Sequence, residues 1–241
     1  DPASVRVNVA FCFPDTYEIG MSNVGMRILY GVMNEMEGVW CQRVFAPWGD
    51  MEEAMRRHHL PLWALESQKP VKDFDMIAFT IGYEMSYSNI LNMLALSKIP
   101  LRSSQREGLK NIVFAGGVCA YNPEPLADFV DFFALGEGEE ITPEIISLYD
   151  RAKAEGWSKE QFLQEVAKIP GIYVPSFYRH EYNADGTLSA IVPLNGAPQV
   201  ITKRIVEDLD SAYYPTRMIV PSTEIVHDRA NLEVFRGCIR G

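Results

Sequence analysis

Residues 5–13 read VRVNVAFCF, and residues 14–20 follow with PDTYEIG. A nearly continuous apolar run of this kind predicts a strand buried on both faces, because a half-exposed strand would alternate polar and apolar side chains. Similar runs recur at intervals long enough to hold a helix, at residues 39–45, 76–81, 112–115 and 129–135. This spacing is typical of βαβ units, so we predict an α/β fold with a parallel sheet and helices on both faces.

Helical patterns fill the intervals between these runs. The first has an apolar face over residues 24–36, with Gly38 as its stop. The third interval has an apolar face over residues 90–95. Polar residues predict three further helix starts, at Asp50 with Glu53, Thr142 with Pro143, and Ser158 with Gln161.

The pattern changes after Gly171. Residues 172–178 and 188–193 predict the strands of an accessory hairpin, joined by the turn-rich residues 183–186. Residues 203–221 have the mixed composition of a linker, and residues 232–235 predict the first strand of a new domain. We therefore divide the chain into residues 1–155, an α/β domain, residues 156–221, a helix, hairpin and linker, and residues 222–241, the start of another domain.

Composition narrows the classes of function. The 241 residues carry a formal net charge of −10, which makes a broad nucleic-acid-binding surface improbable. No apolar run approaches the ~20 residues that span a membrane, and we expect no signal peptide. The four cysteines form no C-x-x-C pair, so we predict a reduced, cytoplasmic protein in which Cys12 and Cys119 serve packing.

Four loops are predicted to meet where ligands bind open parallel sheets, at the carboxyl ends of the strands. They are residues 14–20, 82–86, 116–118 and 136–140, and three of them contain glycine pairs or single glycines after the strand. One such loop alone is common in α/β proteins, whereas four aligned loops indicate a ligand-binding edge without naming the ligand. None matches a dinucleotide fingerprint or a Walker A loop, and Glu137 and Glu139 would repel a pyrophosphate.

Residues 236–241 read RGCIRG and place Cys238 in an Arg/Gly loop after an apolar run. This pattern is typical of the first cysteine of a C-x3-C-x2-C iron–sulfur motif, but by itself it does not favour that motif over the alternative. The alternative is an incidental cysteine.

Taken in order, these motifs resemble a known family. Asp15-x-Tyr17-x-x-Gly20 resembles the D-x-H-x-x-G loop of cobalamin-binding domains, and Gly116-Gly117 resembles their later glycine pair. Residues 136–139 look like the G-E-G-E loop of many cobalamin-type radical SAM proteins, and residues 236–241 look like the start of the radical SAM cluster loop. The whole chain is thus similar to an uncharacterised branch of the cobalamin-binding-domain radical SAM proteins.

The resemblance implies a flavodoxin-like sheet, a connector and the start of a partial barrel. In such enzymes three cysteine thiolates hold a [4Fe–4S] cluster, and one electron from it cleaves S-adenosylmethionine to a 5′-deoxyadenosyl radical. Cys238 would be the first ligand, and the other two would lie after Gly241. The resemblance therefore implies an Fe–S oxidoreductase that needs a reductant, with residues 1–241 inactive alone and the substrate open.

One departure concerns cobalamin. Tyr17 stands where the family has the histidine that ligates cobalt, and a phenol with a pKa of ~10 is a poor ligand at neutral pH. Either cobalamin binds without a protein lower ligand, or the domain has lost the cofactor. If it binds, the expected contacts are Tyr17, Gly20, Gly82, Tyr83, Ser86, Gly116, Gly117 and Gly138.

Two other functions compete with an enzyme fragment. The first is a cofactor-free α/β module that docks a partner or recognises a substrate. The second is a flavodoxin-like electron carrier, which the lack of a Ser/Thr-rich phosphate cradle disfavours.

Overall fold

The computed structural model describes residues 4–229, 231 and 233–237. Its centre is a six-stranded sheet in the order β2-β1-β3-β4-β5-β6, in which β1 to β5 are parallel and β6 is antiparallel to β5. The strands are β1 (Val7–Phe13), β2 (Val39–Phe45), β3 (Met76–Thr80), β4 (Ile112–Gly116), β5 (Phe132–Ala134) and β6 (Ile172–Tyr173). This topology confirms the predicted flavodoxin-like α/β fold.

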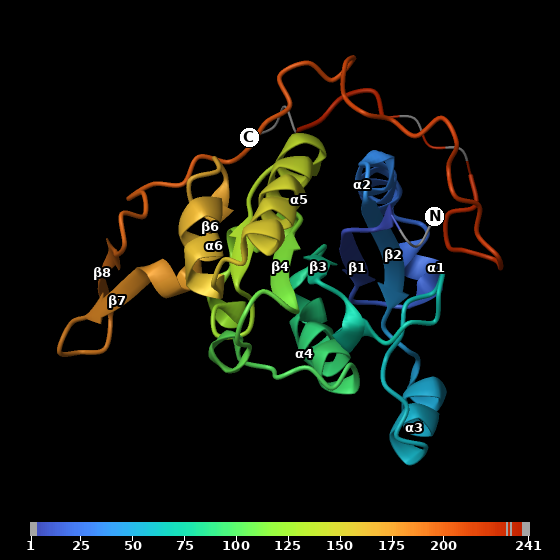
Figure 1. The fold of residues 1–241 in the computed structure, drawn as a ribbon, viewed down its shortest axis with the longest axis horizontal. Coiled ribbons are helices and arrows are strands. Elements are labelled where there is room, and N and C mark those ends of the chain that lie inside the picture. Colours follow the sequence, from blue (N-terminus) through green and yellow to red (C-terminus); the bar gives the residue numbers. More distant parts are fainter. Residues whose placement is uncertain (1–3, 230, 232, 238–241) are drawn as a thin grey trace.

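Helices cover both faces of the sheet (Figure 1). They are α1 (Tyr17–Gly20), α2 (Val24–Glu35), α3 (Gly49–Arg57), α4 (Tyr87–Leu96), α5 (Gly138–Glu155) and α6 (Lys159–Val166). One apolar core lies between the sheet and α2, α5 and α6, and a second lies between the sheet and α3 and α4. Because both faces are covered, the strands are mainly apolar, as predicted, with Asn8 in β1 and Gln42 and Arg43 in the edge strand β2 among the exceptions.

Two predicted local signals are confirmed. Gly38, with φ +77°, follows α2 and turns the chain into β2. Ser158 and Gln161 form a reciprocal capping box at the start of α6, where the Ser158 side chain accepts the Gln161 amide.

Two predicted helix starts are wrong. Helix α3 begins one residue earlier, so Asp50 lies within its first turn and accepts the Met51 amide instead of capping the helix. Helix α5 begins at Gly138, which leaves Pro143 inside the helix. The apolar face already includes the buried Ile141, so packing outweighs the single hydrogen bond that proline cannot donate.

The predicted hairpin is present, but its first strand lies later in the chain, over residues 178–182, and shares only Tyr178 with the predicted residues 172–178. Its strands are β7 (Tyr178–Tyr182) and β8 (Leu188–Pro193), joined through the expected turn, where Gly186 has φ +83°. Residues 172–173 instead form β6 and extend the main sheet. Pro175 starts a short 3₁₀ turn that separates β6 from β7.

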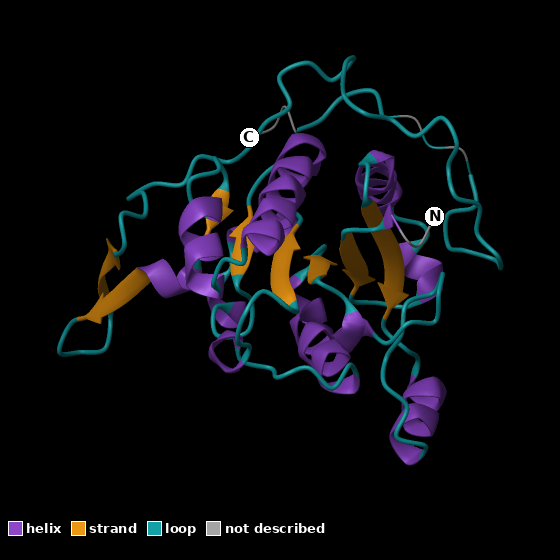
Figure 2. Cartoon of the chain, viewed as in Figure 1, coloured by secondary structure: helices purple, strands orange, loops and turns teal. Residues whose placement is uncertain are grey.

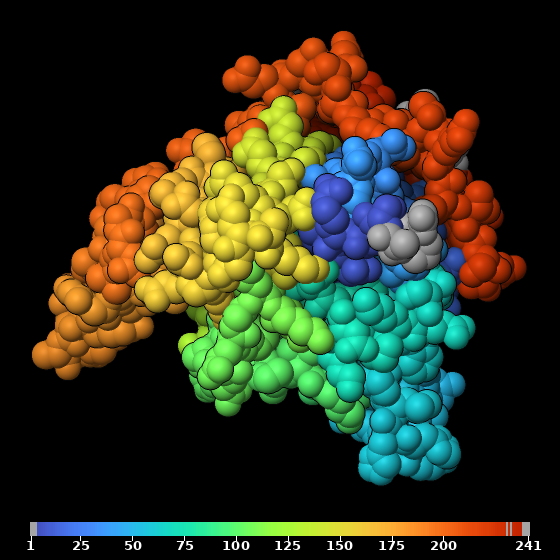
Figure 3. Space-filling model, in the orientation of Figure 1, coloured from blue at the N-terminus to red at the C-terminus, as the bar shows by residue number. Residues whose placement is uncertain are grey.

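Residues 203–237, called the connector below, form no helix or strand in their described part (Figure 2). The described residues 233–235 therefore lack the predicted strand. The connector arches over α5 and α2, while the hairpin and α3 project from the body of the molecule (Figure 3). Within the described ranges, no helix combines the length and apolarity needed to cross a membrane.

Candidate functional site

The loops after β1, β3, β4 and β5 meet at the carboxyl edge of the sheet, as the parallel order requires. Two contacts tie the first loop to the second loop and to helix α4 that follows it. The Tyr83 hydroxyl donates to Asp15 Oδ2 at 2.9 Å, and Asn89 Nδ2 donates to the Pro14 carbonyl at 2.9 Å. The predicted convergence of these loops is present.

Tyr17, the residue in the cobalt-ligand position of the motif, is engaged by the connector. Its hydroxyl oxygen accepts the Ser222 amide at 2.8 Å and lies 3.1 Å from Ser222 Oγ. Its ring packs edge-on against Phe45, with 5.1 Å between ring centroids. The phenol is therefore held on both its polar and its apolar sides.

Gly20 serves close packing. A Cβ atom at this position would lie 2.4 Å from a ring carbon of Phe45 and 3.0 Å from one of Phe13. Real Cβ atoms do not approach so closely, so the glycine lets α1 pack against the ends of β1 and β2. The space that a ligand would need beside Gly20 is filled by these two rings.

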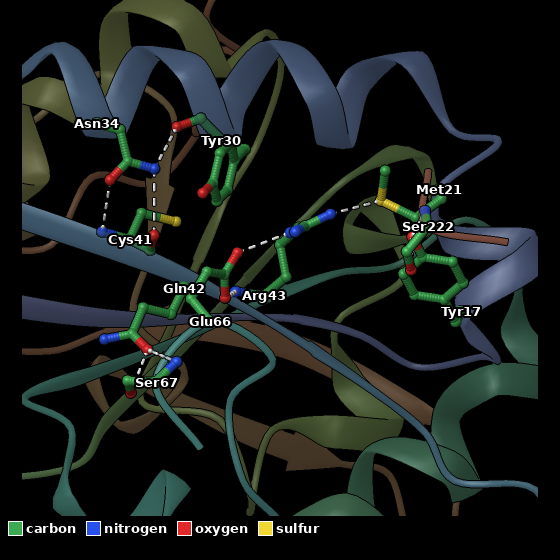
Figure 4. A network of polar contacts seen from close by, with 10 residues as sticks. All are labelled: Tyr17, Met21, Tyr30, Asn34, Cys41, Gln42, Arg43, Glu66, Ser67 and Ser222. Carbon is green, nitrogen blue, oxygen red and sulfur yellow. Dashed lines mark hydrogen bonds and ion pairs between the residues drawn. The ribbon is translucent and has the colours of Figure 1, made fainter. Parts of the chain in front are cut away.

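Arg43 of the edge strand β2 supports the same region (Figure 4). Its guanidinium pairs with Glu66 at 2.7 Å, lies 3.0 Å from the Met21 sulfur and stacks over the Tyr30 ring at 5.3 Å. Burial, reinforced by the nearby Glu66 carboxylate, raises the pKa of Tyr30 to about 12. This partly buried network fixes the end of α1 and the face of α2.

The second loop, residues 82–86, contains one buried polar residue, Ser86, and an exposed side chain, Tyr83. Ser86 is buried, and its hydroxyl donates to the Tyr83 carbonyl at 2.7 Å, so it closes its own turn. Tyr83 is 44% exposed, and its hydrogen bond to Asp15 raises the pKa of the Tyr83 phenol. Gly82 has open space around its Cα, so this loop retains room for a contact.

The glycine pair after β4 holds the second and third loops together. Gly117 has φ +99°, and a Cβ there would lie 2.6 Å from the Ile81 carbonyl oxygen. The Ile81 amide donates to the Gly116 carbonyl at 2.7 Å. These glycines allow the two backbones to approach each other closely.

The loop after β5 is occupied by the chain itself. Gly136 has φ +109°, and a Cβ there would lie 2.1 Å from the Arg204 carbonyl oxygen, because the two residues form a parallel bridge. A Cβ at Gly138 would meet a Leu29 methyl carbon at 2.8 Å. The connector and α2 thus fill the space that these glycines create.

The acidic start of α5 binds two connector arginines. Arg204 pairs with Glu140 at 2.9 Å and also contacts Glu144. Arg236 contacts Glu139, whose side chain is only 8% exposed, and lies 3.6 Å from Glu137. Glu137 additionally accepts the Val206 amide, so both ends of the connector converge on one loop.

Arg236 also pairs with a third carboxylate, that of Glu233, which belongs to the connector itself and lies at 2.7 Å. The hydrogen bonds that the Arg236 guanidinium donates to Glu233, and then to Glu139, raise its pKa, while burial opposes them. The cation is therefore permanently charged and firmly held.

A cavity of about 170 Å³ remains between the sheet and helices α2 and α5. It is mainly apolar and includes three of the predicted contact residues, Gly116, Gly117 and Gly138, beside Leu29 and Met33. Ligand pockets usually enclose roughly 300–1,000 Å³. This cavity can hold only a small apolar group.

The residues present do not fit cobalamin. Tyr17 offers no imidazole and its hydroxyl is engaged by Ser222, while Leu29 and Arg204 occupy the space beside Gly138 and Gly136. The remaining cavity is too small for a nucleotide tail.

The predicted contact residues fall into two groups. Gly82, Tyr83 and Ser86 share one turn that touches the loop of Asp15. Tyr17 contacts the connector, Gly138 meets α2, and Gly20 packs against the ends of β1 and β2, while Gly116-Gly117 lie between the two groups.

Cys238 lies outside the described residues. Among the described ones no cluster of three His, Cys, Asp or Glu side chains could hold a metal ion. Cys12 is buried as predicted, and Cys119 is half-buried beside Glu84.

Sequence reasoning missed two features. One is the set of ion pairs made by Arg204 and Arg236, called the arginine clamps below, and the other is the buried side chain of Arg27. The glutamates at positions 137, 139, 140 and 144 and the connector arginines are visible as complementary charges, but their pairing depends on the fold. Arg27 of α2 is buried beneath the connector, with its Nε and Nη2 atoms unpaired among the described residues and Met218 sulfur 4.0 Å from Nη1.

A larger groove, of about 970 Å³, lies near the hairpin. The buried Asp131 in its wall pairs with Arg106 at 3.1 Å and with Lys159 at 2.6 Å, and Glu124 lies 3.1 Å from His180. Because Asp131 pairs with two cations and Lys159 belongs to α6, we assign these ion pairs to joining α6 to the sheet.

Comparison with known proteins adds a family. Residues 25–175, more than half of the chain, match the family described as radical SAM proteins, N-terminal. An uncharacterized protein of Methanocaldococcus jannaschii is 21% identical over 238 residues. That match covers 97% of this chain and 39% of the relative, so the chain spans about two fifths of the length of the curated relative it matches.

Proposed function

Because this chain belongs to the family of radical SAM N-terminal domains, we propose that it is the front domain of an iron–sulfur enzyme that cleaves S-adenosylmethionine. The match over residues 25–175 is the observation that carries this proposal. Residues 236–241 support it, because Cys238 stands where the first cysteine of a cluster loop belongs. When bound, a [4Fe–4S] cluster would supply the electron that breaks the sulfonium bond.

Cys238 would contribute one thiolate, and two further cysteines would follow Gly241 at offsets of four and seven from Cys238. The domain described here would then provide the approach to the cluster loop through the connector. Cobalamin forms no part of this proposal, because the carboxyl edge does not fit it.

The experiment uses the coding sequence extended beyond Gly241. The longer protein, purified without oxygen and reconstituted, is expected to hold about four iron and four sulfide per chain. After one-electron reduction of the cluster, S-adenosylmethionine should change the electron paramagnetic resonance spectrum. Cleavage should then release methionine and, once the radical has taken a hydrogen atom from substrate or buffer, 5′-deoxyadenosine.

Cys238→Ser should abolish iron binding, whereas Cys119→Ser is the matched control and should retain it. A wild-type protein without iron, or a Cys238→Ser variant with full iron content, would contradict the proposed function.

We also propose a docking role for the open part of the carboxyl edge. Met85 is 82% exposed and Val118 is 70% exposed, and Tyr83 and Tyr121 lie in the same two loops. Such large apolar side chains, gathered on adjacent loops, are typical of surfaces that another domain or a substrate covers. This is the cofactor-free recognition function, placed within the larger enzyme.

Methionine oxidation tests the docking role. Peroxide should oxidise Met85 more slowly in the extended protein than in residues 1–241, while Met51, 40% exposed on the projecting α3, should react equally in both. Equal rates at Met85 would show that the edge stays uncovered.

A further inference from the structure

Four contacts place protein atoms where a cofactor at this edge would lie. Leu29 approaches Gly138, the Arg204 backbone crosses Gly136, and Ser222 holds Tyr17. The fourth contact is the packing of Phe45 and Phe13 against Gly20. Each fills the space beside a glycine, or engages a polar group, that the cobalamin-type motif would present to a ligand.

These contacts come from separate parts of the chain. Leu29 belongs to α2, Phe45 to β2, and Arg204 and Ser222 to the connector. Separate elements would have to move for a macrocycle and its tail to enter, and each movement would give up close packing. The filling is therefore a property of the assembled domain and not of one misplaced side chain.

The connector is also anchored on this edge by charge. Arg204 pairs with Glu140 and Glu144, and Arg236 contacts Glu139 and Glu137. The His227 amide donates to Ser22 Oγ at 3.0 Å, beyond the contact at Tyr17. A ligand would have to compete with these contacts as well as with the apolar packing.

We infer that this domain has closed its own cofactor cradle: the connector and Leu29 take the place of cobalamin and keep the domain cofactor-free. The glycines of the cobalamin-type motif then persist because they allow the chain to pack against itself. This inference concerns residues 1–241 alone and does not depend on Cys238.

The test is equilibrium dialysis of residues 1–241 against hydroxocobalamin. The wild-type domain should show no saturable binding tighter than about 100 μM. In the double variant Tyr17→His with Leu29→Ala, an imidazole is supplied and the side chain beside Gly138 is cut back. The Kd of this variant for hydroxocobalamin should be at least ~10-fold lower than that of the wild-type domain.

The matched control is Tyr17→His with Leu91→Ala. Leu91 lies on α4, on the opposite face of the sheet, so it loses the same side-chain volume away from the cradle. This control should bind no better than the wild-type domain. Circular dichroism and thermal unfolding of both variants establish that each one folds.

Two results would overturn the inference. Saturable binding by the wild-type domain would show that the cradle is open. A folded Tyr17→His, Leu29→Ala variant that binds no better than its control would show that these residues do not close it. A radical SAM cluster in the longer protein is compatible with either result, so the two proposals fail separately.

Discussion

The carboxyl edge of the sheet has two unlike halves. The loops after β1 and β5 are covered by the connector and α2, and their glycines are filled by Phe45, Leu29 and Arg204. The loops after β3 and β4 leave Met85 and Val118 exposed, and Gly82 has open space. Both halves follow parallel strands and both carry glycines, so glycine after a strand does not by itself indicate a ligand. What distinguishes them is the chain segment that returns to one half.

The largest expected effect comes from adding one methyl group to each half. Gly136→Ala places a Cβ against the Arg204 backbone at a φ of +109°, so it should lower the free energy of unfolding by about 3 kcal/mol. Gly82→Ala is the control and should change it by less than ~0.5 kcal/mol, since nothing lies within 4 Å. Urea unfolding measures both, and equal losses would erase the contrast between the halves.

A smaller effect is expected from loosening the covered half. Glu139→Gln weakens the partly buried contact with Arg236. It should lower the free energy needed to detach the connector from α5 by about 1 kcal/mol. Backbone amides near Val206 and Arg236 should then exchange hydrogen roughly 5-fold faster. Glu165→Gln, which breaks only the exposed pair with Lys168, should leave this exchange unchanged. Unchanged exchange in Glu139→Gln would mean that apolar packing alone holds the connector.

The smallest effect concerns alkaline pH. Tyr30, in the network that supports the covered half, has its pKa raised by burial to about 12. A raised folded-state pKa gives stability that is full below the unfolded value of ~10 and is lost as pH rises through 12. At pH 11 this contribution has fallen by up to about 1 kcal/mol, so Tyr30→Phe should lose less stability than wild type between pH 9 and pH 11. Equal losses of stability in the two proteins would contradict a raised pKa for the Tyr30 phenol.

The strands, their parallel arrangement and the position of the edge could be predicted from sequence. The runs over residues 39–45 and 112–115 follow directly from buried parallel strands, and the Ser158 box identifies a helix start. Pro143 misled because local preference is weaker than the packing of Ile141. These outcomes depend on patterns a few residues long, which a sequence displays.

The contents of the edge could not be predicted in the same way. Tyr17 and Ser222 are 205 positions apart in sequence, and Gly138 meets Leu29 from another helix. A motif such as residues 15–20 reports which backbone shapes are allowed, but it does not report which atoms occupy the space. Sequence could therefore select residues after the strands as candidate contacts, but it could not show which atoms lie beside them, and Arg236 and its carboxylates gave no short-range signal.

The two arginine clamps have a consequence for how this part of the chain can change in length during evolution. Arg204 and Arg236 both reach the start of α5, and Glu137 touches the segment at each end, so the residues between them form a ring closed at one point. The exit point at Arg236 is thus set by α5 and not by the length of the ring. Insertions or deletions within the ring should alter how far it bulges while the following polypeptide leaves from the same place. Relatives could then differ widely in this segment and still present the same departure point to whatever follows.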